Sequence, residues 1–485
     1  MSPVDGSERR ARPKREGVSR GAPPSKGMDG GGITDARAAA ALILADLRQG
    51  DLLDGAFERR THSLDARDRR WLHEMLWGML RRRGWIDAVL ASRVKGGLAK
   101  LEPDVVDLLR VGTYQLLFMG SVPAYAAIAQ TVELTKRRDG IGASKLVNAV
   151  LRRVDRERIA DANAERIAGG NAEGSSDNAG LAVEIPKDPV DALAQQYSHP
   201  RWVVARWLER WGLDDTVRLL QANNQEAPIT VRPFGIERDQ LDVMLTASGV
   251  ETSAVPLVPD SIRLGSGVAL TELGAFQQGL LFVQDPAATL VTKYADIPEG
   301  AVVADLCAAP GGKALELTRR ASLVIAADRS RTRAERMITG FSRLNAHKLV
   351  ALVADASDPA IVPVDVVLID VPCTGTGTFR RHPDARGRLR VSDFAVMAAA
   401  QRAILRAAAA IVKPGGLLIY STCSLELEEN DDPIDSFLAA HPEFSLEAPS
   451  EHAVPSTVLD DGRLRVLPQR HGDDGAFAVR LRRAA

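Results

Sequence analysis

Short runs of apolar, mostly β-branched residues recur along the last third of the chain, and helical patterns separate them. These runs cover residues 302–306, 323–327, 349–354, 364–369 and 416–421. Continuous apolar runs of this length are typical of parallel strands that are buried on both faces. The alternation of such runs with helices predicts an α/β Rossmann-like domain over residues 269–485.

The front of the chain has a different periodicity, with apolar positions three and four residues apart. Asp35 precedes an alanine-rich apolar run, as an N-cap residue does. Pro103 opens a helix with one apolar stripe, and further helices begin near Asp65 and Tyr125. The pattern therefore predicts an all-α domain over residues 33–158.

Composition separates the remaining segments. Residues 1–32 contain many Gly, Pro, Arg and Ser residues and few apolar ones, so they predict a disordered basic tail. Residues 159–185 are rich in Ala, Asn, Gly and Ser, which predicts a flexible linker. Residues 186–268 combine strand patterns with a helix opened by Pro200, so we expect a small α+β segment. The tryptophans within that helix, at 202, 207 and 211, are typical of packing against a neighbouring domain.

Charge and cysteine content narrow the class of protein. The net charge of the whole chain is −1, yet residues 33–155 carry twenty Lys/Arg and fifteen Asp/Glu, which favours an anionic partner for the helical domain. Solvated helix faces would give the same charge. Three cysteines, an odd number, and no secretory leader predict a reducing cytoplasm. No apolar run approaches the roughly 20 residues that span a bilayer.

The first apolar run leads into small residues, then Gly311-Gly312, then a helical pattern. A strand, a tight glycine turn and a helix form the first unit of many ligand-binding α/β domains. The spacing differs from the dinucleotide fingerprint G-x-G-x-x-G, and a tight turn without a ligand remains the alternative. The residues expected to contact a cofactor here are Cys307, Ala308, Ala309, Pro310, Gly311, Gly312 and Lys313.

Acidic residues close several of the predicted strands. Asp328 lies sixteen residues after Gly312, a suitable place for a carboxylate that binds a ribose. Asp355 could face an adenine amino group, and Asp370 ends the fourth strand. A lone strand-end Asp is more often a helix N-cap, but the set predicts one adenosine-type site. Since no phosphate-clamping loop is present, S-adenosylmethionine is the predicted cofactor.

Two thiols follow neighbouring predicted strands, Cys373 after Asp370-Val-Pro and Cys423 within Tyr-Ser-Thr-Cys-Ser. The C5 carbon of cytosine is too electron-poor to attack a sulfonium methyl group, unless a thiolate first adds at C6. A second group must then remove the C5 proton. Two thiols and Asp370 supply these groups, whereas Cys307 is expected to be a core residue. The cysteines lack paired metal-ligand spacing, so no metal site is predicted.

Three motifs, at residues 305–313, 370–377 and 420–424, resemble those of the RNA cytosine-5 methyltransferases. Residues 34–155 resemble the antitermination factor NusB, a helical bundle that binds RNA and protein. Together they resemble the bacterial small-subunit (16S) ribosomal RNA cytosine-5 methyltransferase B family. The resemblance implies that Cys423 is the nucleophile and that Cys373 assists product release. The sequence Gly-Ala-Phe at 475–477 departs from the family, in which two Phe usually follow the Gly.

Clustered arginines are the candidates for contact with RNA phosphates. Arg69, Arg70, Arg152 and Arg153 lie in the helical domain, and Arg380 and Arg381 follow the Cys373 loop. Solvated surface positions are the alternative for all of them. We expect ribosomal RNA as the partner, no membrane association and a monomer.

Other functions stay open at this point. In a DNA cytosine-5 methyltransferase Cys373 would attack the base, but the setting of Cys423 and the lack of a later target-recognition domain disfavour that reading. A tRNA or other RNA cytosine-5 methyltransferase is also compatible with the motifs. An RNA-binding assembly factor with an inert methyltransferase fold is disfavoured by the intact Asp370, Cys373 and Cys423.

Overall fold

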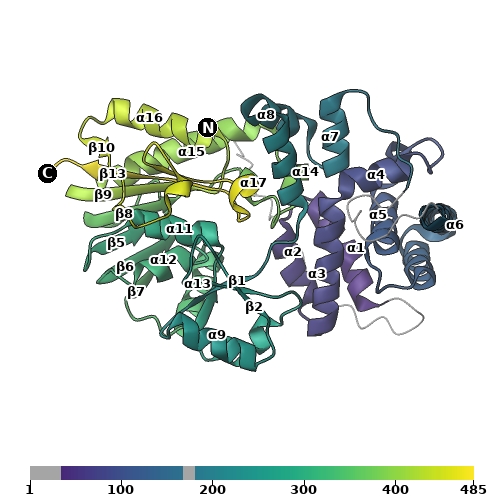
Figure 1. The fold of residues 1–485 in the computed structure, drawn as a ribbon, viewed down its shortest axis with the longest axis horizontal. Coiled ribbons are helices and arrows are strands. Elements are labelled where there is room, and N and C mark those ends of the chain that lie inside the picture. The colour runs from purple at the N-terminus through teal and green to yellow at the C-terminus, as the bar shows by residue number, and fades with distance from the viewer. Residues whose placement is uncertain (1–33, 168–180) are drawn as a thin grey trace, which may run out of the picture.

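The computed structural model describes residues 34–167 and 181–485, which form an all-helical part and a part built on two β-sheets (Figure 1). The predicted tail at 1–32 lies outside the described residues, as do residues 168–180 of the predicted linker. Within the described part of the chain, none of the helices combines the length and apolar character that crossing a membrane requires.

The helical part packs around one apolar core, which confirms the predicted all-α domain. Its helices are α1 (Asp35–Arg48), α2 (Leu53–Thr61), α3 (Ala66–Arg81), α4 (Arg83–Ala91), α5 (Pro103–Phe118) and α6 (Ala124–Ile167). Met75, Leu76 and Leu109 are fully buried in this core. The side chain of Asp65 caps α3 by accepting a hydrogen bond from the backbone N–H of Asp68 at 2.8 Å.

Several helix boundaries differ from the prediction. The N-cap of α1 is Thr34, so Asp35 is the first helical residue, where its charge still complements the helix dipole. Helix α2 was not predicted, because nine residues with four charged side chains show little apolar periodicity. Helix α6 continues to Ile167 through a break at Gly140, so the predicted linker at 159–185 begins inside a helix. Leu181 packs back into the helical core.

The segment after the helical part forms a small antiparallel sheet with flanking helices. Its elements are α7 (Pro189–Tyr197), α8 (Arg201–Asn224), β1 (Thr230–Pro233), α9 (Arg238–Ala247), β2 (Thr252–Ala254), β3 (Ile262–Leu264), α10 (Gly274–Gln277) and β4 (Leu281–Val283). The strand order is β2-β3-β1-β4. The predicted boundary at 268 is therefore wrong, because β4 completes this sheet by pairing with β1. Trp207 is buried against Phe379 of the next domain, as expected from its position among the tryptophans.

The large sheet carries the predicted Rossmann-like core. Its parallel strands are β5 (Val302–Asp305), β6 (Leu323–Asp328), β7 (Leu349–Val353), β8 (Val364–Asp370) and β9 (Val412–Thr422), in the spatial order β9-β8-β5-β6-β7. Antiparallel strands extend the sheet beyond β9: β10 (Phe444–Leu446), β11 (Leu459–Asp460), β12 (Arg463–Val466) and β13 (Ala476–Arg483). The parallel strands confirm the prediction, although β7 is a half-exposed edge strand rather than a buried one. The antiparallel extension was not predicted.

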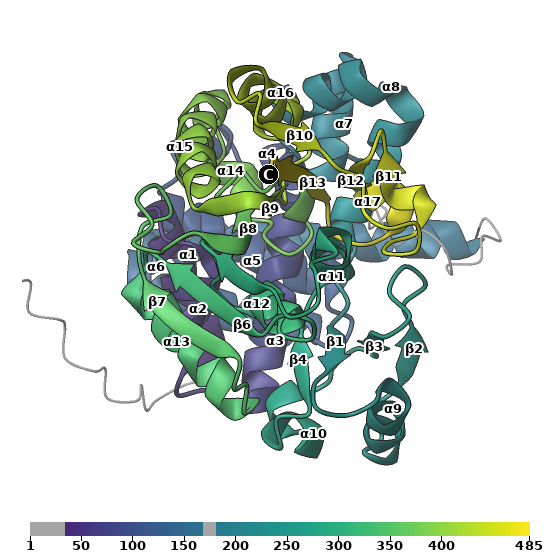
Figure 2. The same cartoon turned by 90° about the vertical axis from the view of Figure 1, so that its left-hand side faces the viewer.

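Helices cover both faces of this sheet (Figures 1 and 2). One layer contains α11 (Pro286–Ala295), α12 (Gly312–Leu317) and α13 (Arg331–Arg343), and the other contains α15 (Val391–Ala410) and α16 (Asp431–Ala440). Strand β5 lies between β6 and β8, and β9 is the other neighbour of β8. The chain segments that leave these strands at their carboxyl ends therefore meet at one edge of the sheet.

The loop that follows Cys373 also joins the methyltransferase-like domain to the helical part. The indole Nε1 of Trp77 donates to the carbonyl oxygen of Arg381 at 2.8 Å. The imidazole of His382 lies 3.2 Å from the carboxylate of Asp54. Arg386, on the short helix α14 (Ala385–Arg388), donates to the carbonyl of Arg81 at 3.3 Å. One loop thus contacts both the helical domain and the carboxyl edge of the large sheet.

Candidate active site

A glycine-rich loop connects β5 to α12 at the carboxyl edge of the sheet. It contains a cis peptide bond between Ala309 and Pro310, and Gly311 has φ +107°. A methyl group on Gly311 would lie 2.7 Å from a ring carbon of Phe341, so both backbone conformation and space require glycine there. The N–H of Ala308 donates to the carbonyl of Ala327 at 2.9 Å. The predicted cofactor loop is therefore packed tightly against β6 and α13.

Two of the predicted cofactor carboxylates follow the neighbouring strands β6 and β7. Asp328 is buried, accepts a hydrogen bond from the N–H of Ser330 at 2.8 Å and lies 3.0 Å from the guanidinium of Arg333. Asp355 is exposed, and hydrogen bonds from the hydroxyl and N–H of Ser357 lower its pKa. The two residues end adjacent strands on the far side of β5 from the cysteines, where an elongated ligand could contact both.

Asp370, at the end of β8, is the centre of a charged cluster. It accepts a hydrogen bond from Lys313 at 2.7 Å and another from the hydroxyl of Ser421 at 2.8 Å. Burial alone would lower the pKa of Lys313, but the negative charges of Asp370, Asp305 and Cys423 outweigh it and raise that pKa. Lys313 therefore stays protonated and provides a fixed positive charge beside Asp370.

Asp305, at the end of β5, is a fully buried carboxyl group. Among the described residues neither of its side-chain oxygens accepts a hydrogen bond of good geometry, although the nearby backbone N–H of Cys307 acts to lower its pKa. Burial, followed by repulsion from Asp370, raises the pKa of Asp305 to about 7. A buried acceptor without a donor costs free energy, so this carboxyl group is suited to a positively charged or hydrogen-bonding ligand group beside the glycine loop.

The two predicted catalytic thiols lie side by side. The Sγ atoms of Cys373 and Cys423 are 3.2 Å apart, because β8 and β9 are parallel neighbours whose residues Asp370 and Ser421 are in register. The hydrogen bond to Cys423 is the main cause that raises the pKa of Cys373 well above its usual value, and burial adds to it. Cys373 therefore holds its proton at neutral pH. Cys307, by contrast, packs against the apolar core, and burial raises its pKa.

A buried carboxylate fixes the backbone on both sides of Cys373. Glu429 is fully buried and accepts hydrogen bonds from the N–H of Thr374 at 2.9 Å and from its hydroxyl group. The amide of Gln401 donates to Glu429 at 3.0 Å and to the carbonyl of Pro372 at 2.9 Å. Residues 372 and 374, which flank the thiol, are thus held by one Glu–Gln pair.

The Cys373 and Cys423 loops also touch through glycines. The N–H of Gly377 donates to the carbonyl of Cys423 at 3.0 Å, and the N–H of Gly475 donates to the carbonyl of Gly377 at 2.8 Å. A methyl group on Gly377 would lie 2.6 Å from that Cys423 oxygen and 2.7 Å from the Cα of Gly475. Since no side chain fits between these backbones, the positions of the two sulfur atoms are linked through the main chain.

Comparison with known proteins gives matches over most of the chain. Residues 34–156 match the NusB family, residues 199–271 match the RsmF/B-like ferredoxin-like domain, and residues 294–482 match the family described as 16S rRNA methyltransferase RsmB/F. A probable ribosomal RNA small subunit methyltransferase B from Synechocystis sp. is 32% identical over 93% of this chain and 100% of its own length. The ribosomal RNA small subunit methyltransferase B of Pseudomonas syringae is 32% identical, over 92% of this chain and 96% of its own.

This chain belongs to the ribosomal RNA small subunit methyltransferase B family. A crystal structure titled PH0851 superposes with a TM-score of 0.74 and 26% identity, covering 92% of this chain and 98% of that one. A methyltransferase homolog from Pyrococcus horikoshii, at 24% identity and a TM-score of 0.52, shares the fold over 61% of this chain and 99% of its own. These matches confirm the resemblance of residues 34–155 to NusB and of the whole chain to the small-subunit ribosomal RNA methyltransferase B family.

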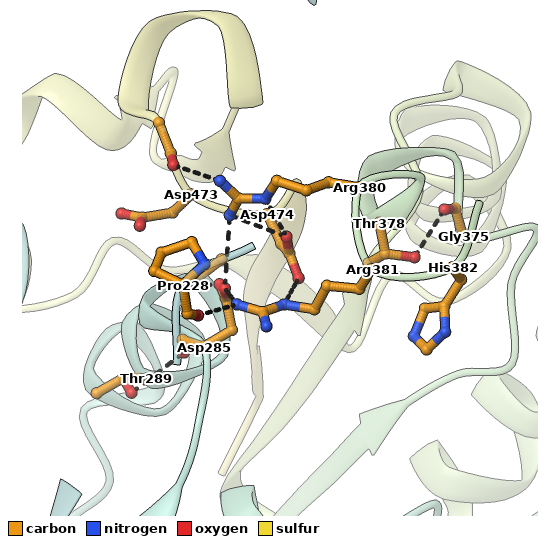
Figure 3. Close-up of polar contacts among 12 residues, drawn as sticks. Pro228, Asp285, Thr289, Gly375, Thr378, Arg380, Arg381, His382, Asp473 and Asp474 are labelled. Carbon is orange, nitrogen blue, oxygen red and sulfur yellow. Dashed lines mark hydrogen bonds and ion pairs between the residues drawn. The ribbon is translucent and has the colours of Figure 1, made fainter. Parts of the chain in front are cut away.

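In this member of the family, the arginines after Cys373 are engaged inside the protein (Figure 3). Arg380 is buried and donates to Asp474 at 3.1 Å and to the carbonyl of Gly472 at 2.9 Å. Arg381 donates to Asp474 at 2.7 Å and to Asp285 at 2.6 Å, and these two carboxylates raise its pKa although burial opposes them. This geometry does not support the prediction that Arg380 and Arg381 bind RNA phosphate; they link the Cys373 loop to α11 and β13.

The other predicted RNA contacts lie on helices of the NusB-like domain. Arg69 on α3 pairs with Glu58 on α2 at 3.0 Å, and its neighbour Arg70 is exposed. On α6, Arg152 donates to Asn148 at 3.0 Å and Arg153 pairs with Glu157 at 2.7 Å. These pairs are accessible to solvent, so the prediction of phosphate contact at these four arginines stays open.

The sequence alone assigned no role to Glu429 and Gln401 of this methyltransferase. In the structure they hold the backbone on both sides of Cys373. We expect Glu429→Gln to speed alkylation of Cys373 by iodoacetamide at a given pH, because loss of the carboxylate charge lowers the pKa of that thiol. The free energy of unfolding should fall by about 1.5–3 kcal/mol, the usual worth of a hydrogen bond to a charged group. Peptide mass spectrometry across a pH series measures the first effect, and urea unfolding the second.

Glu428→Gln is the matched control for this prediction. Glu428 is the next residue along the chain, but its half-exposed carboxylate pairs with Arg206 instead of the Cys373 loop. Its replacement should leave the pH profile of Cys373 alkylation unchanged. An unchanged profile in Glu429→Gln as well would show that Glu429 has no electrostatic influence on the thiol.

Proposed function

We propose that this chain methylates the C5 carbon of a cytosine in small-subunit ribosomal RNA. The observation that carries the proposal is the pair of sulfur atoms, 3.2 Å apart, at the edge of the sheet that also holds the glycine loop. The names of the relatives support the RNA substrate. Two thiols in contact suit a reaction that needs one nucleophile and one proton-transfer group on the same ring.

Residues 307–313 with Asp328, Asp355 and Asp370 would hold S-adenosylmethionine. The buried carboxyl group of Asp305, whose oxygens accept no hydrogen bond of good geometry among the described residues, lies at the start of the glycine loop. Asp328 and Asp355 are the carboxylates suited to the ribose hydroxyls and the adenine amino group. When bound, S-adenosylmethionine would supply an electrophilic methyl group.

At the cytosine ring, different residues of the chain carry out nucleophilic attack and binding of the base. The sulfur of Cys423 adds as a thiolate to C6, which converts C5 into a nucleophile. Asp370, at the end of β8 beside both thiols, is placed to hold the N3/N4 edge of the base. The carboxylate already accepts hydrogen bonds from Lys313 and Ser421, which fix its orientation.

Product release requires removal of the proton that remains on C5. In the resting site the Cys423 sulfur raises the pKa of Cys373. Once Cys423 is bonded to carbon its negative charge is gone, so the pKa of Cys373 falls and its thiolate can form. That thiolate takes the C5 proton, the ring regains its double bond, and the Cys423–C6 bond breaks with the electron pair returning to sulfur. The cytosine must leave its stack to reach both thiols.

One experiment tests the proposal directly. The protein is incubated with small-subunit ribosomal RNA and S-adenosylmethionine, and the RNA is digested to nucleosides for mass spectrometry; 5-methylcytidine is the expected product. RNA that contains 5-fluorocytidine should form a covalent complex on a denaturing gel, because fluorine replaces the proton that must leave. If neither 5-methylcytidine nor a covalent complex is found, the reading as an RNA-binding assembly factor replaces this proposal.

A further inference from the structure

A groove between the helical domain and the methyltransferase domain carries an excess of arginines. It has a volume of about 450 Å³ and lies between α1, α3, α4 and α5 on one side and residues 384–390 on the other. Five arginines line it, and only two aspartates do: Arg48, Arg83, Arg110, Arg388, Arg390, Asp107 and Asp384. The wall formed by 384–390 directly follows the loop that begins at Cys373 in the sequence.

Three of these arginines are neutralised within the protein. Arg48 pairs with Asp104 and Asp107. Arg110 pairs with Asp87 at 2.7 Å and with Asp107 at 2.8 Å. Arg388 pairs with Asp384 at 3.1 Å. Their charges are therefore largely compensated before any partner binds.

Arg83 and Arg390 differ from these three. Both side chains are exposed, and within residues 34–167 and 181–485 no carboxylate lies within 4.0 Å of either guanidinium. A methyl group on Gly387 would lie 3.5 Å from Nη1 of Arg83, so this guanidinium reaches from α4 to the opposite wall. Two guanidinium groups without a carboxylate in ion-pair contact, in one groove, favour an anionic occupant.

The junction behind the groove adds further positive charge. Arg386 donates its hydrogen bonds to carbonyl and amide oxygens, among them those of Asn223 at 2.6 Å and Asn224 at 2.7 Å. Burial, followed by repulsion from Arg81, lowers the pKa of Arg386 to about 9. An anion in the adjacent groove would relieve this repulsion.

The two walls are held in place before any ligand binds. The hydrogen bond between Trp77 and the carbonyl of Arg381 ties the loop to the helical domain. The ion pairs of Arg381 with Asp285 and Asp474 tie it to the start of α11 and to the segment before β13 (Figure 3). A preformed groove costs less ordering free energy on binding than a flexible surface.

We propose that this interdomain groove binds the phosphate backbone of the RNA substrate through Arg83 and Arg390, next to the nucleotide that enters the active site. The inference rests on the proposed function, since it concerns the path of the same RNA. It assigns backbone contact and not base recognition, because guanidinium groups on phosphates fix position without reading sequence.

The test is the salt dependence of binding to a fluorescein-labelled single-stranded RNA, measured by anisotropy over a series of KCl concentrations. For Arg83→Gln/Arg390→Gln, the slope of log affinity against log salt should shrink by about 1.4, or about 0.7 for each lost phosphate contact. That corresponds to a roughly 25-fold loss of affinity at 0.1 M relative to 1 M salt. Arg83→Lys/Arg390→Lys, which keeps both charges, should restore most of the slope.

Two controls separate the possible results. Arg331→Gln removes an exposed arginine of α13, outside the groove, and should leave the slope unchanged. An unchanged slope in Arg83→Gln/Arg390→Gln, or a smaller slope in Arg152→Gln/Arg153→Gln instead, would overturn the groove as the RNA path. Formation of 5-methylcytidine by the wild-type protein tests the proposed function separately, because a protein that binds the RNA without methylating it would still show salt-dependent binding.

Discussion

Cys423→Ala is expected to abolish methyl transfer, with a loss of at least about 10⁴-fold in turnover, as for other enzymes that lose their nucleophile. Without the sulfur atom C6 cannot be attacked, so C5 never becomes nucleophilic. The same variant should give no covalent complex with RNA that contains 5-fluorocytidine. Transfer of a radiolabelled methyl group measures the first effect, and a denaturing gel the second.

Cys307→Ala is the control for this result. Its thiol lies in the same domain but is partly buried and packs against the apolar core, away from the pair of sulfur atoms at Cys373 and Cys423. The Cys307→Ala protein should still form the covalent complex. A complex in Cys423→Ala but none in Cys373→Ala would reverse the assigned roles and favour the DNA-type mechanism, in which the thiol after Val-Pro attacks.

Cys373→Ala should have the opposite signature, with a covalent complex that accumulates on ordinary RNA. Attack by Cys423 and methyl transfer remain possible, but the residue that removes the C5 proton is missing. Loss of a general base costs typically about 10²–10⁴-fold in rate, so turnover should fall by that factor while a single methyl transfer per enzyme persists. A burst experiment with radiolabelled methyl donor and a denaturing gel would show both effects.

The outcome of Cys373→Ala also tests the thiol contact at 3.2 Å. If the variant turns over at the wild-type rate, another group removes the proton, and the buried thiol is only a packing residue. Free cysteine is common in protein interiors as a small apolar side chain, so that outcome is physically reasonable.

The parallel strands and the two thiols could be predicted because their signals are local. Each buried strand is a continuous apolar run, and each thiol follows its strand within three residues, so the parallel order brings Cys373 and Cys423 to one edge. The helical domain was predictable for the same reason, since α5 shows its apolar stripe directly in the sequence. Only the contact distance between the sulfur atoms required the structure.

The remaining features depend on pairing between distant segments. Arg380 and Arg381 are adjacent basic residues, as in many RNA-binding segments, but Asp474 accepts their hydrogen bonds from 94 and 93 residues later in the chain. Glu429 lies in a charged stretch of sequence that predicts an exposed surface segment. Its carboxylate is nevertheless buried and accepts a hydrogen bond from the N–H of Thr374. A sequence shows the charge of such residues but not the partner that neutralises it.

The pairing of β4 with β1 affects how the protein can be divided for experiments. A fragment that begins at residue 269 would retain β4 but lose the strand that supplies its hydrogen bonds, leaving an unprotected sheet edge prone to association. Such a fragment would also lack Trp207, which covers Phe379 beside the Cys373 loop. The catalytic half is therefore best produced with α7, α8 and the whole small sheet attached.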